Sequence, residues 1–122
     1  MIDADQIPAN ALKGLKVLNL AVNVPGPWAA ARLGMLGAEV VKVEPPVGDS
    51  LETRCPSWYR EMADNATVER VDAKTAPGRE RLGALLEGAD VLITSVRPSA
   101  LARMGLADAV DDHQHLCHVE IV

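Results

Sequence analysis

Hydrophobic residues fall into short runs along this chain, and turn residues and segments with helical spacing separate the runs. Residues 15–21 alternate poorly and are mostly apolar, which is typical of a strand covered on both faces. Over residues 39–44 valines alternate with polar residues, which predicts a second strand. Further strands are predicted where Val, Leu and Ile gather again, at residues 68–73, 90–94 and 117–122.

Helices are predicted between these strands. Pro27 suits the first turn of a helix, where its missing N–H would be unpaired in any case, and Gly37 suits the residue that follows a helix. Thr75 is a typical residue to begin the next helix, which closes near Gly88. The predicted helices span residues 27–37, 75–88 and 98–104. Strands that alternate with helices predict an α/β fold, a Rossmann-like parallel sheet with flanking helices.

The chain has 122 residues, the length of one domain, and 48% of them are hydrophobic, enough to form a core. Residues 1–13 are predicted to be a polar leader. Residues 46–67 contain prolines, Gly48 and mixed charges, so they are predicted to form a long loop with at most a short helical piece at 58–62. The sequence therefore predicts a single domain that covers residues 1–122.

Three turns are predicted to meet at one edge of the sheet. In a parallel sheet with right-handed crossovers, the loops that follow the strands lie at the same carboxyl edge. This places residues 22–27, 44–48 and 95–97 close together. We therefore expect the ligand site at this edge.

Charge and composition exclude several kinds of partner. The net charge of −5 argues against a nucleic-acid interface, which needs a clustered basic face. No apolar run approaches the ~18 residues of a membrane span, and the first residues lack the pattern of a signal peptide. A cytoplasmic protein without membrane contact is expected. Cys55 and Cys117 lie in unlike contexts and are predicted to be free thiols.

No residue is assigned a catalytic role from the sequence. The acidic residues lie in turns, at strand entries or in charge pairs, where a solvated carboxylate is the ordinary occupant; they are Asp49, Asp64, Asp72, Asp90, Asp111 and Asp112. Zinc sites do not commonly have the spacing of His113, His115, Cys117 and His118, so no metal site is predicted. The glycines at 26, 34 and 37 do not form the dinucleotide-binding fingerprint, which argues against a nicotinamide cofactor.

Several blocks of the sequence together resemble the amino-terminal portion of the family III CoA-transferases, the CaiB/BaiF group that includes the α-methylacyl-CoA racemases. The blocks occur in order between residues 14 and 106. They are Gly14-Leu-Lys-Val-Leu18, Pro25-Gly-Pro27, Leu36-Gly-Ala-Glu-Val-Val-Lys-Val-Glu-Pro-Pro46, Gly48-Asp49, Asp72-Ala-Lys-Thr75, Pro77-Gly-Arg79, Ala89-Asp-Val-Leu92, Arg97-Pro98 and Leu101-Ala-Arg-Met-Gly-Leu106.

The resemblance implies that the chain is part of a Rossmann-like large domain whose loops surround coenzyme A. The implied CoA-binding residues are Asn23, Val24, Pro25, Ser95, Val96, Arg97, Ala100, Arg103 and Met104. Guanidinium groups suit the phosphates of CoA, which makes Arg97 and Arg103 the leading phosphate contacts, and Met104 offers a polarizable surface for the adenine. CoA or acyl-CoA and a carboxylic acid are the implied substrates, and no tightly bound cofactor is expected.

The chain departs from the family pattern at three places. Val24 stands where the transferases often have Gln, Ser95-Val96 stand where Asn-Phe is common, and the segment at Asn65-Ala-Thr-Val68 lacks the usual cations. The aspartate that is acylated in the transferases, and the His and Asp pair of the racemases, lie further along than residue 122. We therefore expect an incomplete domain that is inactive alone.

Three functions remain open on this resemblance. The first is the amino-terminal part of a CoA-transferase that moves CoA between carboxylic acids, working as a homodimer or paired with a carboxyl-terminal half. The second is the acyl-CoA racemase branch of the same family. The third is a non-catalytic paralogue that binds CoA or a partner chain.

Overall fold

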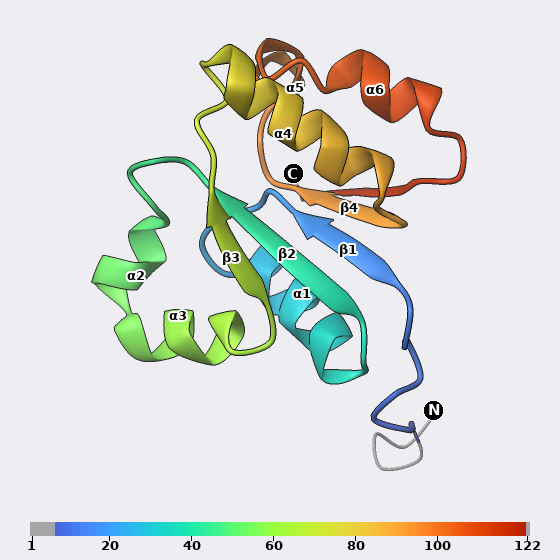
Figure 1. Cartoon of the computed structure of the whole chain (residues 1–122). Coiled ribbons are helices and arrows are strands. Elements are labelled where there is room, and N and C mark those ends of the chain that lie inside the picture. The colour runs from blue at the N-terminus through green and yellow to red at the C-terminus, as the bar shows by residue number, and fades with distance from the viewer. Residues whose placement is uncertain (1–6, 122) are drawn as a thin grey trace.

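The computed structural model describes residues 7–121, and all the strands among them form one parallel sheet (Figure 1). The strand order is β3-β2-β1-β4-β5, so the first strand lies at the centre. The elements in chain order are β1 (Lys16–Asn19), α1 (Pro25–Met35), β2 (Glu39–Glu44), α2 (Ser50–Arg54), α3 (Pro56–Ala63), β3 (Thr67–Arg70), α4 (Ala76–Glu87), β4 (Val91–Thr94), α5 (Pro98–Arg103), α6 (Ala107–Asp112) and β5 (Cys117–Glu120). The predicted α/β class and parallel sheet are confirmed.

Helices cover both faces of the sheet, as Figure 1 shows. Leu18 on β1 packs with Leu82 of α4 and Leu101 of α5, while its neighbour Val17 packs with Ala30 of α1 on the opposite face. Because successive side chains of a strand point to opposite faces, a central strand between two helix layers is apolar on both sides. This explains why the segment at residues 15–21 is mostly apolar without a clear alternation.

The helix α1 begins and ends two residues earlier than the predicted range of 27–37, and Gly37 lies in the turn that follows it. It starts at Pro25, and Gly26 allows it to approach the preceding loop, because a Cβ at Gly26 would overlap that of Ala21. At its other end Gly37 has a φ of +103°, and the N–H of Ala38 donates to the carbonyl of Leu33. This is a Schellman motif, in which glycine tolerates the left-handed backbone.

The segment at residues 46–67 is more regular than the predicted long loop. The short helical piece predicted at 58–62 lies within α3, but α3 is longer, α2 occupies residues 50–54 as well, and β3 begins at Thr67. Asp49 caps α2 by accepting a hydrogen bond from the N–H of Leu51, and Pro56 occupies the first turn of α3. Leu51 and Met62 are the buried residues of these two helices. Helices of five and eight residues are too short for a helical pattern to stand out over the roughly 11 to 18 residues that such a prediction needs.

Smaller differences occur at the ends of the chain. The predicted leader lies partly outside the described residues, and the N–H of Leu12 within it donates to the carbonyl of Leu36 at 2.8 Å. The helix α6 has no counterpart in the predictions. Near the carboxyl terminus, β5 pairs with β4 in the described part of the chain and ends at Glu120.

Candidate functional site

The loops at the carboxyl edge of the sheet are tied to one another by hydrogen bonds. The N–H of Val22 donates to Oγ of Ser95 at 3.3 Å, and the N–H of Asn23 donates to the carboxylate of Asp49, 3.2 Å from each oxygen. The predicted meeting of the three turns at one edge is therefore confirmed. A fourth loop, residues 71–75 after β3, lies at the same edge, as it must in a parallel sheet.

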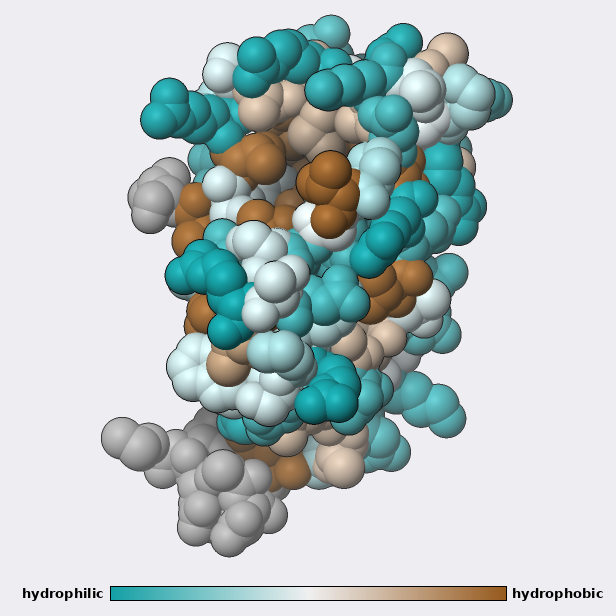
Figure 2. Space-filling model, turned by 90° about the vertical axis from the view of Figure 1, so that its left-hand side faces the viewer, coloured by the Kyte–Doolittle hydropathy of each residue, from teal (hydrophilic) through white to brown (hydrophobic). Residues whose placement is uncertain are grey.

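A cavity of about 520 Å³ opens among these loops, on the side of the sheet that α4 and α5 cover. In Figure 2, hydrophobic side chains surround a hollow in the upper half of the molecule. The residues that line the cavity are mostly apolar and come from all four loops, the end of β2, α4 and the end of α5. They are Leu20, Val22, Val43, Glu44, Pro45, Pro46, Val47, Val71, Asp72, Ala73, Lys74, Leu82, Val96 and Met104.

The loop after β3 brings a positive charge to this cavity. The N–H of Lys74 donates to Oδ1 of Asp72 at 3.0 Å, and Nη1 of Arg79 donates to the carbonyl of Lys74 at 3.1 Å. These bonds hold the loop backbone in place. The Lys74 side chain is exposed and forms no ion pair with any residue in 7–121, so its ammonium is available to an anion. The predictions missed this loop, although the strand predicted over residues 68–73 implies a turn at that edge.

Asp49 lies at the centre of the contacts that hold this edge. It is 3% exposed, and its carboxylate accepts hydrogen bonds from Nζ of Lys42 at 2.5 Å and from the N–H groups of Asn23 and Leu51. The expectation of a solvated carboxylate at Asp49 is therefore wrong. The turn brings its side chain inward because a buried lysine on β2 and two backbone N–H groups replace the water.

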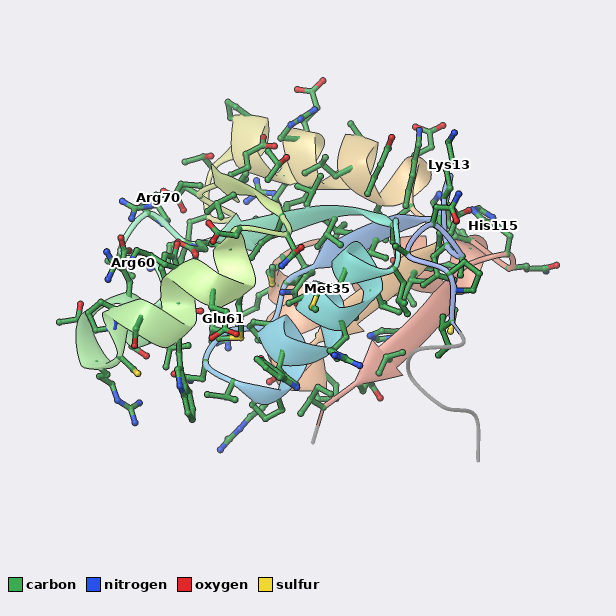
Figure 3. All side chains as sticks on the ribbon, turned by 90° about the horizontal axis from the view of Figure 1, so that it is seen from below. Lys13, Met35, Arg60, Glu61, Arg70 and His115 are labelled. Atoms are coloured by element: carbon green, nitrogen blue, oxygen red, sulfur yellow. The ribbon has the colours of Figure 1, made fainter. Side chains whose placement is uncertain are left out.

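A group of buried charges on β2 surrounds this contact. Lys42 is 5% exposed and Glu44 is fully buried, and Nζ of Lys42 lies 3.0 Å from Oε2 of Glu44. The hydroxyl of Tyr59 donates to the same oxygen at 2.6 Å. On β2, Lys42 and Glu44 share a face with the buried Val40, and α3 reaches this face through the hydroxyl of Tyr59. Arg70, at the end of β3 (Figure 3), lies 3.9 Å from Oε1 of Glu44.

Two groups in this cluster have shifted pKa values. Burial alone would raise the pKa of Asp49, but the hydrogen bonds from Lys42 and from the backbone of Leu51 and Asn23 lower it below its ordinary value. Burial and the hydrogen bond to Glu44 raise the pKa of Tyr59. Asp49 is therefore ionised near neutral pH, and Tyr59 keeps the proton that it donates to Glu44.

The structure distributes the nine CoA-binding residues implied by the sequence around this edge. Val96 and Met104 line the cavity, and the hydroxyl of Ser95 accepts from Val22 beside it. Val24 packs instead against the cluster of Ala31, Leu51 and Met62. The other implied residues are outside the cavity lining: Asn23 in the first loop, Pro25 at the start of α1, Arg97 before α5, and Ala100 and Arg103 within α5. Their contact with a ligand stays a prediction.

The histidines near the carboxyl end have local partners. Nε2 of His118 lies 2.9 Å from Oγ1 of Thr94, and the rings of His113 and His115 meet edge to face with centroids 5.8 Å apart. Among the described residues, no three His, Cys, Asp or Glu side chains are grouped as a metal site requires. Cys55 and Cys117 are both free. No helix within residues 7–121 has the length and apolar character to cross a lipid bilayer.

The chain has relatives of known name and of known structure. It is 34% identical over 113 residues to the (R)-2-hydroxy-4-methylpentanoate CoA-transferase of Clostridioides difficile, covering 83% of this chain and 28% of that protein. The crystal structure of the Mycobacterium tuberculosis protein Rv3272 matches with a TM-score of 0.80 and 31% identity, over 93% of this chain and 34% of that one. A CAIB/BAIF family protein from Brucella suis matches with a TM-score of 0.74 and 33% identity, over 80% and 29%.

The chain therefore spans about a third or less of the length of each of these relatives. The sequence model of the family described as CoA-transferase family III matches residues 12–113 of this chain. Since this match covers most of the chain and the solved structures share its sheet and helices, the chain belongs to CoA-transferase family III.

Proposed function

We propose that the edge cavity binds coenzyme A or an acyl-CoA, and that this chain is the CoA-binding portion of a protein that transfers CoA between carboxylic acids. The observation that carries the proposal is the apolar cavity of about 520 Å³, with Lys74 at its rim forming no ion pair within residues 7–121. CoA combines an adenine ring and an apolar pantetheine arm with phosphates. An apolar cavity bordered by cations suits both parts.

Individual residues fit the parts of this ligand. Val71, Val96 and Met104 offer an apolar surface, and methionine adapts to a flat ring because its side chain is flexible and polarizable. Lys74 supplies a positive charge at the cavity, and Arg103 adjoins Met104 at the end of α5. Phosphate groups bind such cations through charge-assisted hydrogen bonds. We assign Arg97 and Arg103 to the phosphates as well.

The two buried carboxylates at this edge are unsuited to covalent catalysis. Asp49 is surrounded by Lys42 and two backbone N–H groups, and Glu44 is held by Lys42 and Tyr59. A nucleophilic carboxylate needs a face open to the acyl carbon. In our proposal the acylated group of the transfer reaction comes from outside residues 7–121, and the residues described here bind and orient the thioester.

The proposal includes an assembly. The strands β5 and β3 lie at the two edges of the described sheet. Each carries an exposed valine: Val119 on β5 is 39% exposed, and Val68 on β3 is 37% exposed. Exposed strand edges with apolar side chains favour pairing with further chain. We propose a cytoplasmic protein that works as a homodimer or with a carboxyl-terminal half, and that uses CoA as a substrate without a tightly bound cofactor.

Calorimetric titration of the chain with CoA tests this function directly. We expect saturable binding of CoA, and weaker binding of pantetheine, which lacks the adenosine and its phosphates. A chain that is folded by circular dichroism and binds neither compound at millimolar concentration contradicts the proposal.

Replacing Arg103 with alanine tests the assigned phosphate contact. Loss of one charge-assisted hydrogen bond weakens binding by ~1.5 to 3 kcal/mol, which is about 10- to 150-fold in Kd. The matched control is Arg32→Ala, which removes the same charge from the exposed surface of α1 on the other face of the sheet. Equal affinity of the Arg103 variant and the wild type in the same titration would remove Arg103 from the site.

A further inference from the structure

We infer that Asp49 is a positioning residue for the ligand edge, because its buried carboxylate holds the backbone of the loop after β1 in the shape that borders the cavity. The inference rests on the proposed function, since the ligand in question is CoA. Asp49 is not among the residues that line the cavity. Any effect of Asp49 on binding must therefore pass through the groups that it holds.

One carboxylate joins three parts of the fold. It accepts from Nζ of Lys42 on β2, from the N–H of Leu51 in α2 and from the N–H of Asn23 in the first loop. The side chain of Asp49 is fully buried in its ion pair with Lys42. A buried charge that is well compensated by donors holds those donors at fixed positions, because moving any of them exposes the charge to an apolar environment.

The backbone that Asp49 holds has an unusual conformation. Asn23 has a φ of +66°, in the left-handed region where residues other than glycine are uncommon. Its amide oxygen accepts a further hydrogen bond, from Oγ of Ser50 at 2.9 Å. Val22, the residue before it, lines the cavity and is held on its other side by Ser95. The hydrogen bond from the N–H of Asn23 to Asp49 thus determines where Val22 contacts the ligand.

Tyr59 provides a matched control within the same cluster. Its hydroxyl donates to Glu44, and its ring lies 4.8 Å from Nζ of Lys42, but none of its hydrogen bonds reaches Asn23. Tyr59→Phe therefore removes a partly buried hydrogen bond and leaves the tie between Asp49 and Asn23 in place. A comparison of Asp49 and Tyr59 variants separates positioning from general loss of stability.

The experiment combines CoA titration with amide hydrogen exchange measured by NMR on the whole chain. Asp49→Ala should weaken CoA binding at least ten-fold and speed the exchange of the Asn23 amide, while amides of β1 and β4 stay protected. Asp49→Asn keeps one acceptor oxygen for the backbone N–H groups but places its NH2 group beside the ammonium of Lys42, so it should recover only part of the affinity and protection. Tyr59→Phe should leave both the Kd and the exchange of Asn23 as in the wild type.

Two results would overturn the inference: unchanged Asn23 exchange in Asp49→Ala, or a loss of affinity in Tyr59→Phe equal to that in Asp49→Ala. Should Asp49→Ala fail to fold, Ser50→Ala removes the bond to the Asn23 side chain instead, and faster Asn23 exchange with weaker binding is again expected. A wild-type chain that does not bind CoA contradicts the proposed function, and the exchange of Asn23 then still decides whether Asp49 positions the loop.

Discussion

Replacing Lys42 with methionine should lower the free energy of unfolding at pH 7 by about 3 to 5 kcal/mol, the usual cost of breaking a buried ion pair. Methionine preserves the length of the side chain and the packing of its stem. It removes the ammonium that lies between Asp49 and Glu44, both of which are buried. Two carboxylates are then left together with no buried cation between them.

The loss should depend on pH in a definite direction. In the wild type, folding lowers the pKa of Asp49. Its ionised carboxylate therefore stabilises the fold at pH values above its pKa in the unfolded chain, and this stabilisation is lost as the pH falls through its pKa in the folded protein. Without Lys42, burial acts on Asp49 with less compensation, and its folded pKa rises. In the variant, Asp49 therefore becomes protonated at a higher pH than in the wild type, and this protonation removes part of the cost of the buried charge. The difference in the free energy of unfolding between the variant and the wild type should become smaller as the pH is lowered from 7 toward 4.

Urea denaturation of both proteins at several pH values measures this difference. Lys13→Met makes the same chemical change at an exposed position and should alter stability by less than about 0.5 kcal/mol. A gap between the Lys42 variant and the wild type that stays constant from pH 7 to pH 4 would show that the carboxylates near Lys42 do not cause the loss.

Replacing Gly78 with alanine should lower the free energy of unfolding by about 3 kcal/mol and weaken CoA binding as well. A Cβ at this position would overlap the backbone carbonyl of Asp72 and lie 2.9 Å from Oγ1 of Thr75. Backbone atoms cannot move away as the end of a side chain can. The loop must shift, and with it the capping bond from the N–H of Gly78 to Thr75 and the position of Lys74 at the cavity.

The same helix supplies a control of identical chemistry. A Cβ at Gly83 meets no atom within 4 Å. Because glycine in a helix interior is less favourable than alanine, Gly83→Ala should raise the stability by about 0.5 to 1 kcal/mol. Thermal unfolding and CoA titration of the two variants compare them directly. Equal stability of Gly78→Ala and the wild type would mean that the loop and α4 are not in close contact there.

Much of the fold is predictable because the signals are local. The mostly apolar segment at residues 15–21 indicates a central strand, and the positions of Pro27, Gly37 and Thr75 indicate helix ends. Parallel order follows from strands that alternate with helices. The edge where loops meet could be placed for the same reason, and two of the implied residues, Val96 and Met104, do line the cavity.

The features that were missed all depend on contacts between distant segments. The cavity needs Val71 and Lys74 from the loop after β3 beside Leu20 from the loop after β1, and no local pattern relates them. The helices α2 and α3 each bury a single residue, in a cluster with Ala31 of α1, and with five and eight residues they are too short for a helical pattern to stand out in the sequence.

The sequence by itself determined the alternation of strands and helices, the parallel order and the edge at which the loops meet, because backbone geometry and hydrophobic periodicity act over a few residues. Only the tertiary structure decided that Asp49 and Lys42 are buried partners and that Tyr59 of α3 hydrogen-bonds to the buried Glu44. A charged residue leaves water only where other segments supply its hydrogen bonds, and those segments meet only when the chain has folded.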